Sequence, residues 1–195
     1  MKGGHMASDV SVLVRDKQMQ KQNSSINNRR AFAIHGTVTL ICMGLAIVMT
    51  LFSAFLSPPI WQFGILAVLS LYIRFGYCYL IPLPKSNLLS VSSVTALSLF
   101  LVGFLFTGTL VGGSQIEVIF DYWWAVNLII VFNLPAIFGA GVIYELFTQS
   151  NPAFNSLPFS LYCIAAFVPS LLMYVGLCLK RWKQGKEAAV QNLEK

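Results

Sequence analysis

Charged residues are scarce in this sequence, and almost none lie in its middle. Asp, Glu, Lys and Arg make up 10% of the 195 residues, whereas 56% of the residues are hydrophobic. An ordinary soluble domain has about 25% charged residues. Of the thirteen Lys and Arg residues, all but Arg74 and Lys85 lie before residue 31 or after residue 179. This distribution excludes an ordinary soluble domain and favours a chain embedded in a bilayer.

The sequence also lacks a basic stripe interleaved with aromatic residues, although its formal net charge is +6. Such a stripe is typical of a folded nucleic-acid-binding face. The basic residues flank apolar segments instead, where they attract anionic head groups. We therefore predict membrane lipids as partners and no nucleic acid.

Signatures of catalysis and metal binding are missing as well. The histidines are His5 and His35, and the four cysteines show no C-x-x-C spacing. No H-E-x-x-H, no G-x-S-x-G and no phosphate-binding glycine loop occurs. The sequence therefore predicts no cofactor, no metal and no catalytic residue. The cysteines are expected to pack as small core residues, and His35 is expected at the head-group level.

Long apolar runs dominate what remains. A helix needs about 20 residues to cross the hydrocarbon core of a bilayer. The runs of this length are Ala31–Ser57, Ile60–Leu83, Leu88–Gly112, Ile119–Phe147 and Leu157–Leu179. We predict an all-α polytopic transmembrane helical bundle with about five membrane-embedded helices, forming a single domain over residues 31–179.

The two ends of the chain are polar and basic. Residues 1–30 combine "MKGGHMAS", which has the composition of a cloning remnant, with a polar basic tail that is expected to be flexible or to lie on a surface. Residues 180–195 form a basic C-terminal tail. The positive-inside tendency places both ends in the cytoplasm and the chain in the cell membrane.

Five crossings cannot place both ends on one side. Four crossings result if Ile60–Leu83, which Arg74 interrupts, fails to cross. Six result if Ile119–Phe147 bends at Asn133-Leu134-Pro135 into two short crossings.

Arg74 and Glu145 are the first candidate site residues. A charged side chain inside a membrane usually faces protein or water. With five crossings both residues come to the cytoplasmic side, where they would form an ionic clasp that holds two helices together and binds a lipid head group. The alternative for Arg74 is that its side chain reaches the head groups alone.

The stretch "DYWWAVNLIIVFNLP" supplies three further candidates. Asp121 belongs to an interfacial belt with the aromatic residues that follow it. Asn127 lies on the same face as Glu145 if the helix is straight. Asn133 either repairs the kink at Pro135 or lines a cavity at a broken helix.

Small and hydroxyl residues predict how the helices pack. Gly103 and Thr107 are spaced for a close helix approach. The hydroxyls of Ser90, Ser92, Ser93, Thr95 and Ser98 are expected to bond back to helix carbonyls, with a polar pore lining as the alternative.

These observations favour a non-enzymatic integral membrane protein. It would act through helix contacts as a small membrane subunit or accessory protein, with a second copy or another membrane protein as partner, and would bind lipid. One alternative is a small homo-oligomeric transporter or channel with a polar path near Asn127, Asn133 and Glu145. The other is an intramembrane enzyme that acts on a lipid.

Overall fold

Every regular element in the described part of the chain is a helix. The computed structural model describes residues 4–52, 58–83, 88–111, 123–148 and 159–193. These ranges contain five helices and no strand: α1 (Gly4–Leu51), α2 (Pro58–Tyr79), α3 (Ser92–Val111), α5 (Trp123–Thr148) and α6 (Phe159–Leu193). The predicted all-α class is confirmed.

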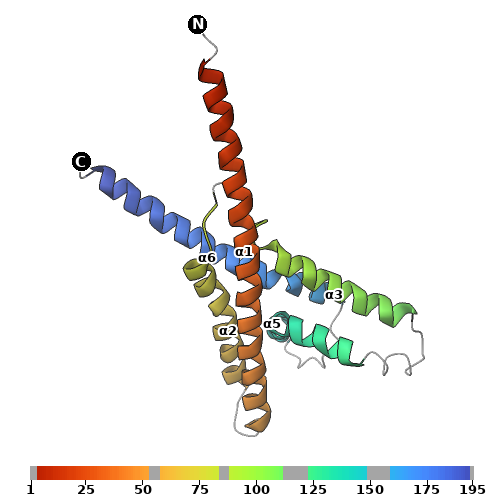
Figure 1. The fold of residues 1–195 in the computed structure, drawn as a ribbon. Coiled ribbons are helices and arrows are strands. Elements are labelled where there is room, and N and C mark those ends of the chain that lie inside the picture. Colours follow the sequence, from red (N-terminus) through yellow and green to blue (C-terminus); the bar gives the residue numbers. More distant parts are fainter. Residues whose placement is uncertain (1–3, 53–57, 84–87, 112–122, 149–158, 194–195) are drawn as a thin grey trace.

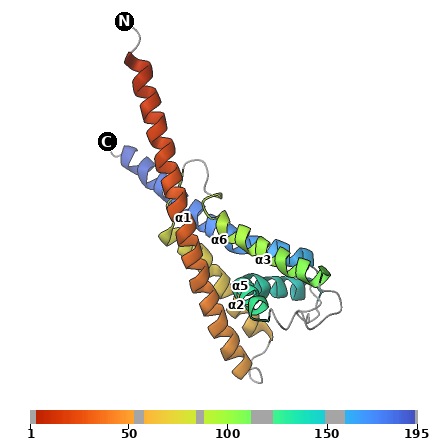
Figure 2. The ribbon, with the colours of Figure 1, turned by 45° about the vertical axis from the view of Figure 1, so that its right-hand side comes forward.

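Helices α1 and α2 form an antiparallel pair, and the other three helices lie across it (Figure 1). Helices α3 and α6 run side by side in opposite directions in both views (Figures 1 and 2). Helix α6 packs most extensively against α2, and α5 contacts α1, α2, α3 and α6. Helix α3 in turn contacts α1, α5 and α6.

Two helical arms extend from one end of this bundle. They are the N-terminal part of α1 and the C-terminal part of α6, and both leave the bundle where α2 ends (Figure 1). The side chains of residues 14–19 and 181–191 are exposed. The tail, which the sequence predicts to be flexible or to lie on a surface, is helical from Gly4 onward, in one helix with the apolar run that follows it.

Proline positions the ends of some helices and lies inside others. Pro58 opens α2, where a missing backbone N–H costs no helical hydrogen bond. Helix α5 continues through Pro135 and α6 continues through Pro169. The six-crossing alternative divides this run into two short crossings at Asn133-Leu134-Pro135. In the structure, α5 is a single helix through this stretch.

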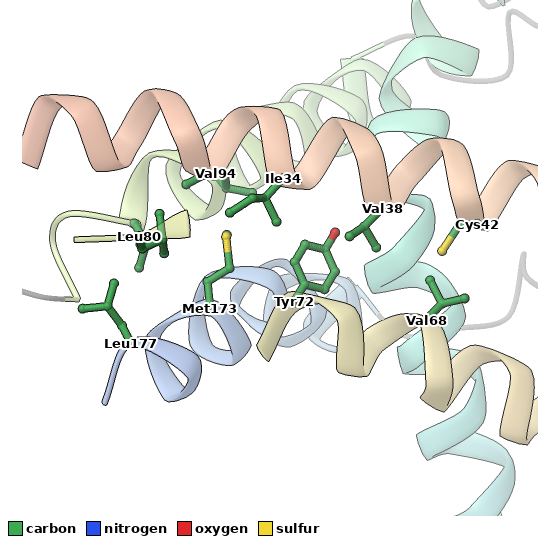
Figure 3. Packing of buried hydrophobic residues seen from close by; sticks show 11 residues of the cluster. Ile34, Val38, Cys42, Val68, Tyr72, Leu80, Val94, Met173 and Leu177 are labelled. Atoms are coloured by element: carbon green, nitrogen blue, oxygen red, sulfur yellow. The ribbon is translucent and has the colours of Figure 1, made fainter. Parts of the chain in front are cut away.

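The main hydrophobic core lies between α1, α2 and α6 (Figure 3). Each helix contributes residues four positions apart, which share a helix face. The buried residues labelled in Figure 3 are Ile34, Val38 and Cys42 on α1, Val68 and Tyr72 on α2, Met173 and Leu177 on α6, and Leu80 and Val94 beside them. This core fixes the relative positions of the three helices that form the site described below.

Two glycines set the close approach of α2 and α6. A Cβ on Gly76 would lie 2.5 Å from the carbonyl oxygen of Met173. A Cβ on Gly176 would lie 2.8 Å from the backbone nitrogen of Tyr77 and still closer to the carbonyl oxygen of Ile73. Small residues let helix backbones approach in this way. Within the described part of the chain, no such close approach is seen at Gly103, where a Cβ would meet no atom within 4 Å.

Two of the described helices are long and apolar enough to cross a membrane, over Val14–Val48 and Tyr162–Gln191. Within the residues whose side chains the structure describes, α3 and α5 contribute the shorter apolar stretches Ser92–Phe104 and Ile130–Val142. The prediction of about five membrane-embedded helices is therefore not confirmed. What holds is an all-helical fold with two candidate membrane-spanning helices in its described part.

Candidate functional site

Long side chains from α1 and α6 converge on the C-terminal end of α2. The last carbonyls of a helix have no partner within the helix and carry a partial negative charge. Arg30 donates from Nη1 to the carbonyl oxygen of Tyr79 at 2.7 Å. Lys180 donates from Nζ to the carbonyl oxygen of Leu80 at 2.8 Å and to that of Cys78 at 3.4 Å. Two cations from different helices therefore cap α2.

Asn27 holds the extended segment that follows α2. Its Nδ2 donates to the carbonyl oxygen of Ile81 at 2.8 Å, and its Oδ1 accepts from the backbone nitrogen of Ile81 at 2.9 Å. Nδ2 also lies 3.3 Å from Oγ of Ser90. The Asn27 side chain is fully buried. It thus provides a hydrogen-bond partner for both the N–H and the carbonyl group of Ile81.

The connection between α2 and α3 is also held from α6. Ser170 donates from Oγ to the carbonyl oxygen of Val91 at 2.8 Å, and both residues are buried. Together with Asn27 and the two cations, this bond ties α1, α6 and the residues after α2 into one polar junction. We call this set, comprising Asn27, Arg30, Ser170 and Lys180 with their backbone partners, the α2 junction.

His35 forms a second polar contact deeper in the bundle. Its Nδ1 lies 2.7 Å from the hydroxyl oxygen of Tyr72 on α2, and its Nε2 lies 2.8 Å from the carbonyl oxygen of Phe132 on α5. The ring stacks on Tyr72 with centroids 5.9 Å apart and meets the Phe132 ring edge-on at 4.5 Å. The expectation that His35 lies at the head groups is wrong, because its side chain is only 1% exposed.

The partners of His35 fix its tautomer. A backbone carbonyl can only accept, so Nε2 carries the proton that it donates to Phe132. In the neutral ring Nδ1 then accepts from the Tyr72 hydroxyl. Both ring nitrogens are therefore engaged, one as donor and one as acceptor. His35 joins α1, α2 and α5 structurally.

The position of Phe132 explains why α5 takes part. Phe132 lies three residues before Pro135, next to Val131, whose carbonyl loses its helical donor because Pro135 has no N–H. The carbonyl of Phe132 accepts from His35 on another helix, and the repair of the kink by Asn133 stays a prediction. Asn133 itself is buried, at 3% exposure.

The remaining candidates from the sequence are placed as follows. Arg74 is exposed on α2, in its last turns before Tyr79. Asn127 and Glu145 lie on α5, but their side chains are outside the described part of the chain, and Asp121 lies outside it altogether. The Arg74–Glu145 clasp and the interfacial role of Asp121 therefore stay predictions.

The hydroxyl groups of α3 differ from the expectation. Ser92 bonds back to the carbonyl oxygen of Leu89 at 3.0 Å, as predicted. For Ser93, Thr95 and Ser98, the hydroxyl oxygens are buried and have no hydrogen-bond partner among the described residues. The same holds for Thr39 on α1. The back-bonding prediction is therefore wrong for these three α3 residues.

The described residues contain no group of three or more His, Cys, Asp or Glu side chains placed to hold a metal ion. Their cysteines are free thiols, of which Cys42 is buried and Cys78 is exposed. What the geometry offers is a set of interhelical hydrogen bonds and a basic, partly open surface around the end of α2.

Comparison with protein-family models, curated proteins and solved structures finds no match. The functional argument therefore rests on the contacts described above.

Proposed function

We propose that this chain is a non-enzymatic integral membrane protein that acts through helix contacts as a small membrane subunit or accessory protein. The observation that carries the proposal is the contrast between its inside and its outside. The long-range polar contacts of Asn27 and His35 bind helices and their connections to one another. The outer faces present large apolar side chains instead, among them Leu40 at 68%, Phe63 at 71% and Phe100 at 68% exposure.

An apolar outer surface of this kind is explained by lipid or by another apolar helix. In water, large contiguous apolar patches mark binding sites or cause aggregation. In a bilayer they face hydrocarbon, and helices associate there through close packing and interhelical hydrogen bonds. The exposed apolar residues on α1, α2, α3 and α6 are thus the surfaces available to lipid, to a second copy or to a membrane partner.

The basic residues on the two arms indicate which side of the membrane the arms occupy. Arg15 and Lys17 lie on the exposed arm of α1, and Lys183 and Lys186 lie on that of α6. Basic residues next to membrane segments favour the cytoplasmic side. The proposal therefore places both arms in the cytoplasm beside the cell membrane.

Two measurements on the full chain test this function. After expression in cells, the chain should remain with the membrane pellet at alkaline pH and be released by detergent. Release without detergent contradicts the membrane location. Copurification from native membranes should then give a stoichiometric partner, either a membrane protein or a second copy, whereas a monomer without a partner contradicts the subunit role.

A small transporter is the second candidate, and the buried hydroxyls favour it. Buried polar atoms are normally hydrogen-bonded, yet those of Thr39, Thr95 and Ser98 have no partner among the described residues. A hydrated polar path would supply such partners. Solute flux in proteoliposomes that falls on Thr95→Val or Ser98→Ala would favour the transporter, and flux that is absent or unchanged by both would favour the subunit.

A further inference from the structure

An open groove of about 440 Å³ lies between α1 and α2, beside the α2 junction. Helix α1 contributes Arg30, Ile34 and Thr37 to its lining, and α2 contributes Phe75 and Tyr79. Because the two helices are antiparallel, Arg30 and Tyr79 lie toward the arms, whereas Thr37 and Phe75 lie further along the bundle. The groove therefore runs from a basic end into the apolar part of the bundle.

The inner part of the groove presents mainly hydrocarbon. The rings of Phe75 and Tyr79 lie one helical turn apart with centroids separated by 5.9 Å. Thr37 donates its hydroxyl proton to the carbonyl oxygen of Ala33 at 2.9 Å, within its own helix. Ile34 is buried behind these side chains. An alkyl chain placed here would meet aromatic and aliphatic surface along its length.

The outer part of the groove carries a positioned cation. The bond from Arg30 to the Tyr79 carbonyl, at 2.7 Å, holds the guanidinium at the mouth of the groove. A guanidinium has five N–H donors, so donors remain for a ligand. No carboxylate among the described side chains forms an ion pair with Arg30. The exposed Arg74 adds positive charge near this end of α2.

We propose that this groove binds an anionic phospholipid from the leaflet that faces the two arms. The phosphate lies on the Arg30 guanidinium, and one acyl chain lies along Phe75 and Thr37. Charge at one end and hydrocarbon at the other match the two parts of such a lipid, in the direction in which it stands in that leaflet. The inference rests on the membrane location proposed above and names the ligand class for it.

Native mass spectrometry of the detergent-purified full chain measures the binding. Phosphatidylglycerol and phosphatidylcholine with the same acyl chains are titrated separately. We expect one phosphatidylglycerol to bind per chain in preference to phosphatidylcholine. Arg30→Gln should weaken that binding by about fivefold, the contribution of one basic residue near an anionic surface. The matched control is Arg29→Gln, which removes the same charge one residue away from the groove lining and should have little effect.

A second variant leaves the cation and its hydrogen bond in place. Ala33 lines the groove and is exposed, so Ala33→Leu fills the groove without removing Arg30. This variant should also weaken phosphatidylglycerol binding. It keeps the proposal testable if Arg30→Gln disturbs the end of α2. A groove variant that binds phosphatidylglycerol as wild type does would overturn the proposal.

Cys78 locates the bound lipid because it is an exposed groove residue. In nanodiscs, phosphatidylglycerol should slow the maleimide labelling of Cys78 relative to pure phosphatidylcholine. Cys178, which lines a separate groove on α6, serves as the control within the same molecule and should not change. Equal effects on both thiols, or slowing by inorganic phosphate alone, would contradict a lipid in this groove.

The outcomes also separate the two proposals. A chain that stays in the membrane pellet but shows no preference for phosphatidylglycerol loses the groove assignment alone. A chain that leaves the membrane without detergent loses the proposed function as well.

Discussion

At the residue scale, the most constrained polar side chain is Asn27. Asn27→Ala should lower stability by about 2 to 6 kcal/mol, because the two backbone groups of Ile81 lose their partners and each buried unsatisfied group costs about 1 to 3 kcal/mol. The unfolding temperature of the detergent-solubilised chain measures this loss. Asn28→Ala is the matched control, since Asn28 Oδ1 has no hydrogen-bond partner among the described residues. An equal loss in both variants would contradict the role assigned to Asn27.

His35 and Tyr72 permit a sharper test through a double-mutant cycle. Tyr72→Phe removes one buried hydrogen bond and should cost about 1 kcal/mol in the wild-type background. In a His35→Ala background the same change should cost little, because the acceptor is already gone. Tyr79→Phe, at an exposed tyrosine, is the control. Costs that are additive in the double variant would show that the two side chains are not coupled.

The sequence draws attention to Arg30, Lys180 and His35, but it does not predict the hydrogen bonds that they form. Arg30 and Lys180 stand where the positive-inside tendency expects cations, and this tendency says nothing of helix carbonyls. The acceptor of Arg30 lies 49 positions away and that of Lys180 lies 100 positions away. The sequence predicts His35 at the head groups because it lies near the start of an apolar run. Its burial depends on a carbonyl 97 residues away, which no local pattern reveals.

At the element scale, the glycine contact of α2 with α6 decides how closely the bundle closes. Gly76→Ala and Gly176→Ala should each destabilise the chain by about 1 to 3 kcal/mol, because the added methyl group meets backbone atoms that cannot move aside. Thermal unfolding in detergent checks both variants.

Matched controls come from glycines in open surroundings. Among the described residues, a Cβ on Gly36 or Gly103 would meet no atom within 4 Å, so alanine there should be neutral or slightly stabilising in a helix. If these two variants lose as much stability as Gly76→Ala, the close approach of α2 and α6 is not the cause.

The element bounds show what apolar runs predict well and what they miss. The runs Ile60–Leu83 and Leu88–Gly112 correspond to α2 (Pro58–Tyr79) and α3 (Ser92–Val111) within a few residues. The run that begins at Ala31 marks only part of α1, and the run that ends at Leu179 marks only part of α6. Apolar composition marks what lies against lipid or core, whereas a helix continues into polar sequence once it is nucleated.

At the scale of the whole molecule, the two arms leave the same end of the bundle, which bears on the number of crossings (Figure 1). We expect Gln22→Cys and Gln184→Cys, both at exposed arm positions, to react with a membrane-impermeant maleimide from the same side. The measurement uses sealed right-side-out vesicles and a background without the native cysteines. Both thiols should react only after permeabilisation, because basic flanks favour the cytoplasm.

The opposite end of α1 supplies the control for this experiment. Leu51 is 73% exposed and ends α1 at the end of the bundle away from the arms. Leu51→Cys should therefore react before permeabilisation if α1 crosses the membrane. Labelling of Gln22→Cys and Gln184→Cys from opposite sides would contradict the shared orientation of the arms. It would indicate an odd number of crossings, because an even number returns the chain to the side on which it began.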